Sequence, residues 1–239
     1  MITGHPVFTD EAEEEMQLLE YSFRTTACAV FGSGSYFGWL LEADPSVAYD
    51  YLKMQLQYLQ WQFPQNRAKP WLLKSPINFG IEAQLCRNFE NARFIATHRD
   101  PAKCVPSIAA VSHNWHLLYS DVEADLTSGK ALTAYLGQSA DDHLAWRDAG
   151  PDRQILDIAF ADVSARDTEV IQTIYESLGL PLTERSKRAM QDWSTRNPRN
   201  KHGGHSYTSE QFGTTDKAIR ERFADYITRF APYLEPLTV

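Results

Sequence analysis

The stretch RFIATHRDPAKCVPS, residues 93–107, decides the fold class of this chain. The run at 93–97 is rich in apolar and β-branched residues, which predicts a short buried strand. Pro101 then stands at a favoured first position of a helix, so a helix is expected over 101–117. A strand that leads directly into a helix is typical of the βα units that build parallel sheets.

Two further runs, WLLK at 71–74 and ILDIAF at 155–160, predict buried strands of the same kind. Helical patterns at about 78–89 and 131–149 separate these runs. Strands that alternate with helices indicate an α/β fold with a short parallel sheet. Ligands of such sheets bind beyond the carboxyl ends of the strands. The residues that directly follow each strand are therefore the candidate site residues.

The sequence patterns at both ends of the chain predict helices. Residues 10–28 predict a helix whose many acids face solvent. A second helix is expected to begin at Pro45. Its apolar side chains form one stripe, made of Val47, Tyr51, Met54, Tyr58 and Trp61. We expect the aromatic residues of this stripe in the core, with the alternative that some line a binding pocket. Residues 164–233 predict three helices, with a loop at 197–213 between the last two.

The composition excludes several classes of protein. The 239 residues carry 43% hydrophobic and 23% charged side chains, which is usual for a globular domain. No apolar run approaches the length of a membrane span, and the first 20 residues do not resemble a signal peptide. The net charge of −8 argues against binding to nucleic acid. Three cysteines without metal-ligand spacing suit a reduced, cytoplasmic protein.

Arg99 and Ser107 form the first candidate site. Arg99 follows the predicted strand at 93–97, and Ser107 lies two turns into the helix after it. A guanidinium fork and a hydroxyl beside a helix N-terminus suit a phosphate monoester. The alternative is a structural ion pair between Arg99 and a nearby acid. Lys74 ends the predicted strand at 71–74 and is expected to point into the same cleft.

The order of these motifs resembles that of sulfotransferases that use 3′-phosphoadenosine-5′-phosphosulfate. Arg-Asp-Pro at 99–101 with Ser107 resembles their 3′-phosphate signature, and Leu-Lys-Ser-Pro at 73–76 resembles the strand-end motif of a bacterial branch. Phe-Ala-Asp-Val at 160–163 and the Trp, Asn-Pro and Gly-Gly pattern at 193–213 follow in that family's order. The resemblance implies a nucleotide-kinase-like α/β fold. It also implies metal-free transfer of a sulfuryl group to the hydroxyl or amine of a small-molecule acceptor.

The resemblance also implies roles for single residues. Arg99 and Ser107 would grip the 3′-phosphate, and Phe160 would contact the adenine unless it is a core residue. The loop at 197–207 would close over the nucleotide unless it is only a basic surface loop. Its candidate nucleotide-binding residues are Arg199, Lys201, Gly203 and Gly204.

The catalytic residues are less clear from the resemblance. The family often has a histidine as base where this chain has Asn78, and an amide cannot accept a proton at neutral pH. Lys74 is expected to stabilise the transferring sulfuryl group. Glu82, one helical turn after Asn78, and His113 or His116 are the remaining candidate bases. Two other histidines have structural interpretations: His98 is expected to orient the strand end, and His143 is expected at the surface.

One landmark of the family does not occur in these residues. Its Gly- and Thr-rich loop, which holds the 5′-phosphosulfate, has no counterpart here, since Gly32-Ser33-Gly34-Ser35 lacks a phosphate-loop lysine and threonine. The strand at 93–97 is therefore expected to have an unpaired side. That side would be an exposed sheet edge, a homodimer contact, or a place filled by a local segment.

The expected organisation is one sulfotransferase-like domain over 1–239. It would comprise a helical insert at 1–63, a strand and helix core at 71–163, and a helical C-terminal region at 164–239. No sulfuryl transfer is expected from these residues alone. A degenerate relative that binds a nucleotide or a partner without catalysis is the alternative. A P-loop kinase is disfavoured because the chain has no Walker lysine.

Overall fold

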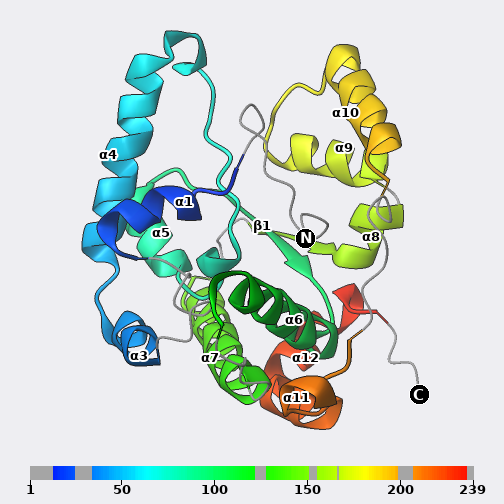
Figure 1. The fold of residues 1–239 in the computed structure, drawn as a ribbon. Helices are drawn as coiled ribbons and strands as arrows, with labels where there is room; N and C mark the ends of the chain where they lie inside the picture. Colours follow the sequence, from blue (N-terminus) through cyan, green and yellow to red (C-terminus); the bar gives the residue numbers. More distant parts are fainter. Residues whose placement is uncertain are drawn as a thin grey trace.

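A parallel pair of strands lies at the centre of the molecule (Figure 1). The computed structural model describes residues 13–24, 34–121, 128–150, 155–165, 167–198 and 207–235. Within them, β1 (Phe94–His98) pairs in parallel with β2 (Ile155–Ala159), in a register that joins Phe94 to Ile155 and His98 to Ala159. Helices surround this pair, which confirms the predicted α/β fold.

The segment between the two strands forms the helices that the sequence predicts. α6 (Pro101–Tyr119) starts directly after β1, and α7 (Ser128–Asp148) precedes β2. The side chain of Asp100 caps α6 by accepting a hydrogen bond from the backbone N–H of Ala102 at 2.9 Å. This cap and the proline at the first helical position start α6 at the end of the strand.

The predicted strand at 71–74 is wrong. These residues pair with no strand among the described residues, and the Leu72 side chain is 84% exposed. Of the four residues, only Leu73 packs against a buried cluster. The backbone N–H of Lys74 donates to the Glu15 carboxylate at 2.7 Å rather than to a neighbouring strand. An apolar run becomes a strand only where a second strand offers backbone partners.

The N-terminal half is helical, and the predicted core stripe on its long helix is also wrong. Val47, Tyr51, Met54, Tyr58 and Trp61 are all exposed. The helix buries its other face, with Tyr49, Leu52 and Leu56 packed among Leu19 and Leu85. Both faces of this helix are apolar, so periodicity alone could not tell which one meets the body of the protein. The elements of this half are α1 (Met16–Leu19), η1 (Glu20–Ser22), α3 (Gly34–Glu42), α4 (Ser46–Gln62), η2 (Pro64–Asn66), η3 (Pro76–Asn78) and α5 (Glu82–Asn88).

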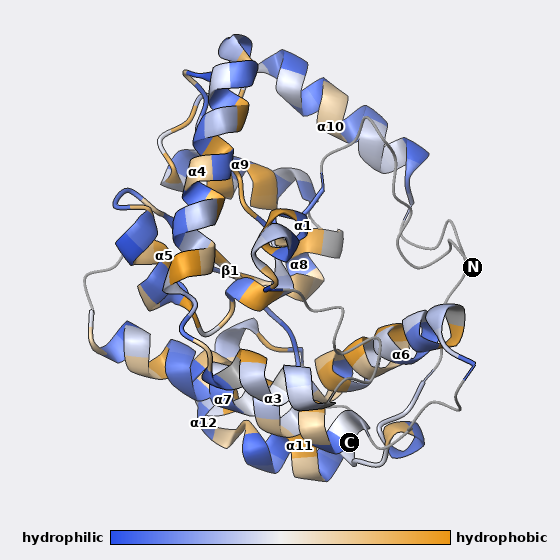
Figure 2. Ribbon diagram, turned by 60° about the vertical axis from the view of Figure 1, so that its left-hand side comes forward, coloured by the Kyte–Doolittle hydropathy of each residue, from blue (hydrophilic) through white to orange (hydrophobic). Residues whose placement is uncertain are grey.

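The C-terminal region has more and shorter helices than the three that the sequence predicts. β2 runs directly into a helix at Phe160, and a second helix follows after residue 166. Figure 2 shows α10 as mostly hydrophilic, and the structure buries none of its residues. The described elements are α8 (Phe160–Ala165), α9 (Asp167–Ser177), α10 (Glu184–Arg196), η4 (Glu210–Phe212), α11 (Asp216–Arg222), α12 (Ala224–Phe230) and η5 (Ala231–Tyr233).

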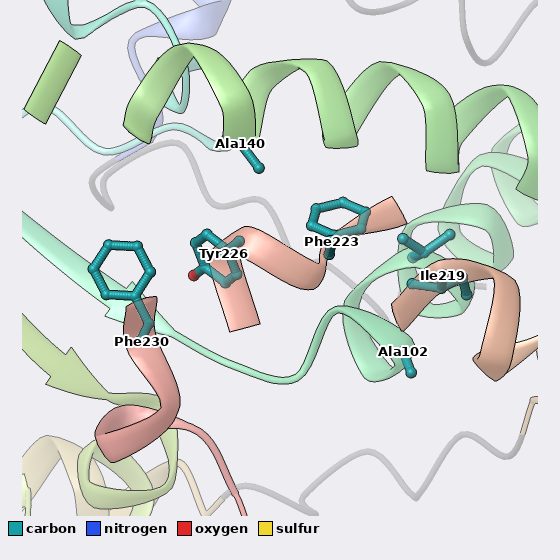
Figure 3. Close-up of a cluster of buried hydrophobic side chains, with 7 residues drawn as sticks. Ala102, Ala140, Ile219, Phe223, Tyr226 and Phe230 are labelled. Carbon is teal, nitrogen blue, oxygen red and sulfur yellow. The ribbon is translucent and has the colours of Figure 1, made fainter. Parts of the chain in front are cut away.

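A second buried cluster joins the last helices to the first βα unit (Figure 3). Ile219 from α11 and Phe223, Tyr226 and Phe230 from the chain around α12 pack with residues of α6 and α7. Burying aromatic side chains stabilises such a contact by about 1.5–3 kcal/mol each. The C-terminal helices are therefore held against the end of β1, where the candidate site begins.

One side of β1 has no strand partner among the described residues, because β2 is its only strand neighbour there. Residues 1–12 and 25–33 lie outside the described residues, so all three expected outcomes, an exposed edge, a homodimer contact or a local segment in the gap, remain predictions. None of the described helices is long and apolar enough to cross a membrane.

Candidate functional site

Arg99 and Phe160 meet at the carboxyl ends of the two strands. Arg99 follows β1 directly, and Phe160 follows β2. The guanidinium carbon of Arg99 lies 4.8 Å from the centre of the Phe160 ring, which is within the range of a cation–π contact. The register of the parallel pair brings these residues together, because its last partners are His98 and Ala159. Phe160 therefore supports the arginine side chain in this structure.

The Arg99 guanidinium forms no ion pair with the described residues. No Asp or Glu among the described residues forms a salt bridge with it, and its Nε atom is buried without a hydrogen-bond partner. A buried polar atom without a partner in the protein is available to a ligand or a water molecule. The structural ion pair considered for Arg99 is therefore absent from this part of the chain.

A cavity of about 440 Å³ opens beside Arg99. This volume lies within the usual range of small-molecule sites. The start of α6 forms one wall, and the segment after the predicted closing loop forms another. The lining residues are Arg99, Ala102, Lys103, Pro106, Tyr207, Thr208, Ser209, Glu210 and Asp216. Ser107 does not line the cavity but lies one turn beyond Lys103 on α6.

The charges on the cavity wall single out Arg99 as the group for an anion. The Lys103 ammonium pairs with the Glu235 carboxylate at 2.5 Å. The Asp216 carboxylate accepts a hydrogen bond from the Ser209 hydroxyl at 2.6 Å. Arg99 is thus the lining cation without an ionic partner in the described part of the chain, and a guanidinium binds phosphate oxygens in bidentate fashion.

Lys74 and Asn78 lie away from the cavity, in a polar cluster around Glu15. The Glu15 carboxylate accepts from the Lys74 backbone N–H at 2.7 Å and from the Asn78 side-chain amide at 2.5 Å. The Lys74 ammonium itself pairs with Glu14. Glu15 is only 6% exposed, so the expectation that the whole acidic run faces solvent is wrong. Because Glu15 lies 59 and 63 residues away from these partners, no local sequence signal identified it.

Two of the three other candidate bases, Glu82 and His113, lie away from both Arg99 and Lys74, and the role of the third, His116, stays a prediction. The Glu82 carboxylate is 5% exposed and lies 2.7 Å from His143 Nδ1, so His143 is buried and not at the surface as expected. His113 packs on the edge of the Phe212 ring and has a buried Nδ1 atom without a partner. Neither Glu82 nor His113 lines the Arg99 cavity. Their catalytic roles stay predictions.

The structure thus shows two clusters. Arg99, Phe160 and the cavity form one, and Lys74, Asn78 and Glu15 form the other. No hydrogen bond or ion pair among the described residues joins the two clusters, and a shared cleft for Lys74 and Arg99 remains a prediction. The loop residues Arg199, Lys201, Gly203 and Gly204 lie outside the described residues. Among the described side chains, no group of three His, Cys, Asp or Glu residues is placed to hold a metal ion.

Glu15→Gln tests how much the polar cluster around Glu15 contributes to the stability of the fold. We expect the free energy of unfolding to fall by about 1–3 kcal/mol, because buried N–H donors lose a charged acceptor. Glu221→Gln is the control, since both side chains of its pair with Lys217 are largely exposed and such pairs contribute at most about 1 kcal/mol. Urea unfolding of both variants measures the difference. Equal effects would contradict the buried role of Glu15.

Comparison with known proteins assigns this architecture. A family model described as the sulfotransferase family matches residues 2–184. The structure is similar to sulfotransferase STF9 from Mycobacterium avium, with 26% sequence identity and a TM-score of 0.84, covering 95% of this chain and 59% of that one. It shares its fold with sulfotransferase STF1 from Mycobacterium tuberculosis H37Rv, at 23% identity and a TM-score of 0.77, covering 92% of this chain and 57% of that one. No curated protein sequence matches the chain.

Proposed function

Because this chain belongs to the sulfotransferase family, we propose that it binds 3′-phosphoadenosine-5′-phosphosulfate and takes part in sulfuryl transfer to a hydroxyl or amine of a small-molecule acceptor. The observation that carries the proposal is Arg99, which follows β1, rests on Phe160 and lines a cavity of about 440 Å³. The chain spans 59% and 57% of the lengths of the two similar structures. The donor, the acceptor and the reaction are therefore proposals for this chain.

Arg99 is the proposed ligand of the 3′-phosphate. A phosphate monoester carries nearly two negative charges at neutral pH, and a guanidinium pairs with two of its oxygens at once. Ser107, further along α6, would donate its hydroxyl to the same group. Residues 207–210 also line the cavity. Arg199, Lys201, Gly203 and Gly204, which precede this segment, are the proposed closing residues over the nucleotide.

Glu15 is the proposed base on the acceptor side. The donor supplies a sulfuryl group whose bond to phosphate breaks as the acceptor oxygen or nitrogen bonds to sulfur. The acceptor must then lose a proton, and a carboxylate can take it where Asn78 cannot. Glu15 adjoins Asn78, the position where the resemblance leads one to expect a histidine. The Lys74 backbone N–H donates to Glu15, and the Lys74 ammonium, once released from its pair with Glu14, would neutralise charge on the transferring group.

Titration with two nucleotides tests the proposed donor site. The chain should bind 3′-phosphoadenosine-5′-phosphate at least about tenfold more tightly than adenosine-5′-phosphate, because a charge-assisted contact contributes about 1.5–3 kcal/mol. Isothermal titration calorimetry measures both dissociation constants. Equal affinity for the two nucleotides would refute a 3′-phosphate site.

A non-catalytic nucleotide-binding protein is the second candidate. The sequence favours it because residues 1–239 contain no Gly- and Thr-rich phosphate loop. We expect no transfer from a labelled donor by these residues alone. The assay is therefore run in parallel on any longer natural protein that contains them. Turnover there that Glu15→Gln lowers by about 10²–10⁴, the typical contribution of a general base, favours the enzyme, whereas nucleotide binding without turnover favours the non-catalytic protein.

A further inference from the structure

The residues on either side of Arg99 are among the most buried in the described chain. His98 is 2% and Asp100 is 4% exposed, while Arg99 between them reaches the cavity. Each of these neighbours is bonded by a side chain from the C-terminal helices. Tyr226 of α12 contacts His98, and Arg220 of α11 contacts Asp100. Neither Tyr226 nor Arg220 lines the cavity.

His98 has one defined orientation. Its Nε2 atom lies 2.9 Å from Asp157 Oδ1, and its Nδ1 atom lies 2.8 Å from the Tyr226 hydroxyl. Arg147 donates to both oxygens of Asp157, at 2.7 and 2.8 Å. An ionised carboxylate can only accept, so Nε2 carries a proton, and in the neutral ring Nδ1 accepts the proton of the Tyr226 hydroxyl. The His98 ring also stacks on Phe230, with ring centres 4.1 Å apart.

The ionisation of two of these partners supports that assignment. Burial alone would raise the pKa of Asp157, but hydrogen bonds from His98 and Arg147 and the Arg147 charge outweigh it and hold the pKa well below its usual value. Burial raises the pKa of Tyr226 above that of an ordinary phenol, so its hydroxyl keeps its proton at neutral pH. The hydroxyl is therefore available as the donor to His98.

Asp100 is held just as closely on the other side of Arg99. One carboxylate oxygen accepts from the Ala102 backbone N–H at 2.9 Å and caps α6. The other accepts from the Arg220 guanidinium at 2.7 Å. The Arg220 guanidinium thus bonds to the turn that follows the strand and does not line the cavity, although its Nε atom, like that of Arg99, is buried without a partner among the described residues.

These contacts set the direction of Arg99. Successive side chains of an extended chain point to opposite faces, so a fixed His98 sends Arg99 to the other side, where it meets Phe160. We propose that helices α11 and α12 position Arg99 through Asp100 and His98, which makes Arg220 and Tyr226 determinants of selectivity for a 3′-phosphate that neither of them touches. This inference rests on the proposed function, in which Arg99 binds that phosphate.

Two variants remove these contacts without touching the cavity wall. Tyr226→Phe keeps the ring in the core and deletes the hydroxyl, and Arg220→Met keeps the aliphatic stem. The measured quantity is the dissociation constant for adenosine-5′-phosphate divided by that for 3′-phosphoadenosine-5′-phosphate. We expect this ratio to fall about fivefold in Tyr226→Phe and about tenfold in Arg220→Met, as for loss of a neutral and a charge-assisted hydrogen bond. Arg220→Lys should restore part of it.

Matched controls separate positioning from general destabilisation. Tyr49→Phe deletes another buried hydroxyl, which has no partner among the described residues. Arg222→Met removes a neighbouring arginine of similar exposure, whose partner Asp141 is far more exposed than the partner of Arg220. Both controls should leave the ratio unchanged. An unchanged ratio in both Tyr226→Phe and Arg220→Met, or an equal fall in affinity for both nucleotides, would overturn the inference.

A second readout needs no nucleotide. The Arg99 side-chain N–H resonance, assigned by its loss in Arg99→Lys, should carry a ring-current shift from Phe160 in the parent. We expect that shift to shrink in Tyr226→Phe and Arg220→Met and to persist in both controls. Its persistence in all variants would overturn the inference. If the shift shrinks while the parent binds both nucleotides equally, the positioning of Arg99 is upheld and the proposed function fails.

Discussion

Arg99→Ala should weaken binding of 3′-phosphoadenosine-5′-phosphate by roughly 2–5 kcal/mol, the range for removing one partner of a desolvated charge pair. The guanidinium lies over Phe160 and lines the cavity without an ionic partner among the described residues, so its charge is available to a bound phosphate. Affinity for adenosine-5′-phosphate should change little, because that nucleotide lacks the 3′-phosphate. Calorimetric titration of parent and variant with both nucleotides measures the effect.

Lys103→Ala is the control for Arg99→Ala. Lys103 lines the same cavity, but its ammonium already pairs with Glu235. Its loss should cost at most about 1 kcal/mol of nucleotide affinity, as for a partly exposed ion pair. Equal affinity of the Arg99→Ala variant and the parent for the 3′-phosphorylated nucleotide would refute the assignment of Arg99. An effect of Lys103→Ala as large as that of Arg99→Ala would show that the cavity attracts anions without a dedicated ligand.

Asp157→Ala should lower the free energy of unfolding by roughly 3–5 kcal/mol, the cost of removing one partner from a buried ion pair. Asp157 accepts hydrogen bonds from Arg147 and His98, and its side chain is only 12% exposed. Without the carboxylate, the Arg147 guanidinium would be left largely enclosed beside the Phe230 ring. Urea denaturation at pH 7 measures the change. Asp141→Ala, which breaks the exposed pair with Arg222, should cost at most about 1 kcal/mol.

The same carboxylate makes stability depend on pH. The pKa of Asp157 lies below its ordinary value of 3.8 in the folded protein, so folding favours the ionised form. Its contribution is fully present above that ordinary value and is lost as the pH falls through the lower, folded pKa. Asp157→Asn should therefore flatten the loss of stability below about pH 4. A parent and variant with the same acid dependence would contradict the role of Asp157 as the stabilising carboxylate.

The sequence alone predicted the part of the fold that depends on neighbouring residues. The run at 93–97 followed by Pro101 predicted β1 and α6, and the run at 155–160 predicted β2. These predictions were correct because the signals for a strand and for the start of the next helix lie in neighbouring residues. The strand pattern also placed Arg99 at the carboxyl end of a parallel strand, where ligands bind. Phe160 was named only through the family resemblance, and the structure shows that it meets Arg99.

The sequence-based predictions were wrong where the structure depends on contacts between distant segments. WLLK at 71–74 has the composition of a strand, yet the Lys74 backbone N–H bonds to the Glu15 side chain. The two apolar faces of α4 are indistinguishable in the sequence, and only packing against α1 and α5 shows that Tyr49 and Leu52 are the buried ones. Periodicity reports that a face is apolar, not what covers it.

The sequence by itself determined the βα units and the position of Arg99 at a strand end, because short-range patterns encode them. Only the tertiary structure showed that Glu15 holds Lys74 and Asn78, that His143 is buried against Glu82, and that Tyr226 and Arg220 bond the neighbours of Arg99. These contacts join residues 59 to 128 positions apart. Hydrogen bonds and charge pairs of this kind depend on atoms brought within about 3 Å, and no spacing in a single sequence reports such a distance.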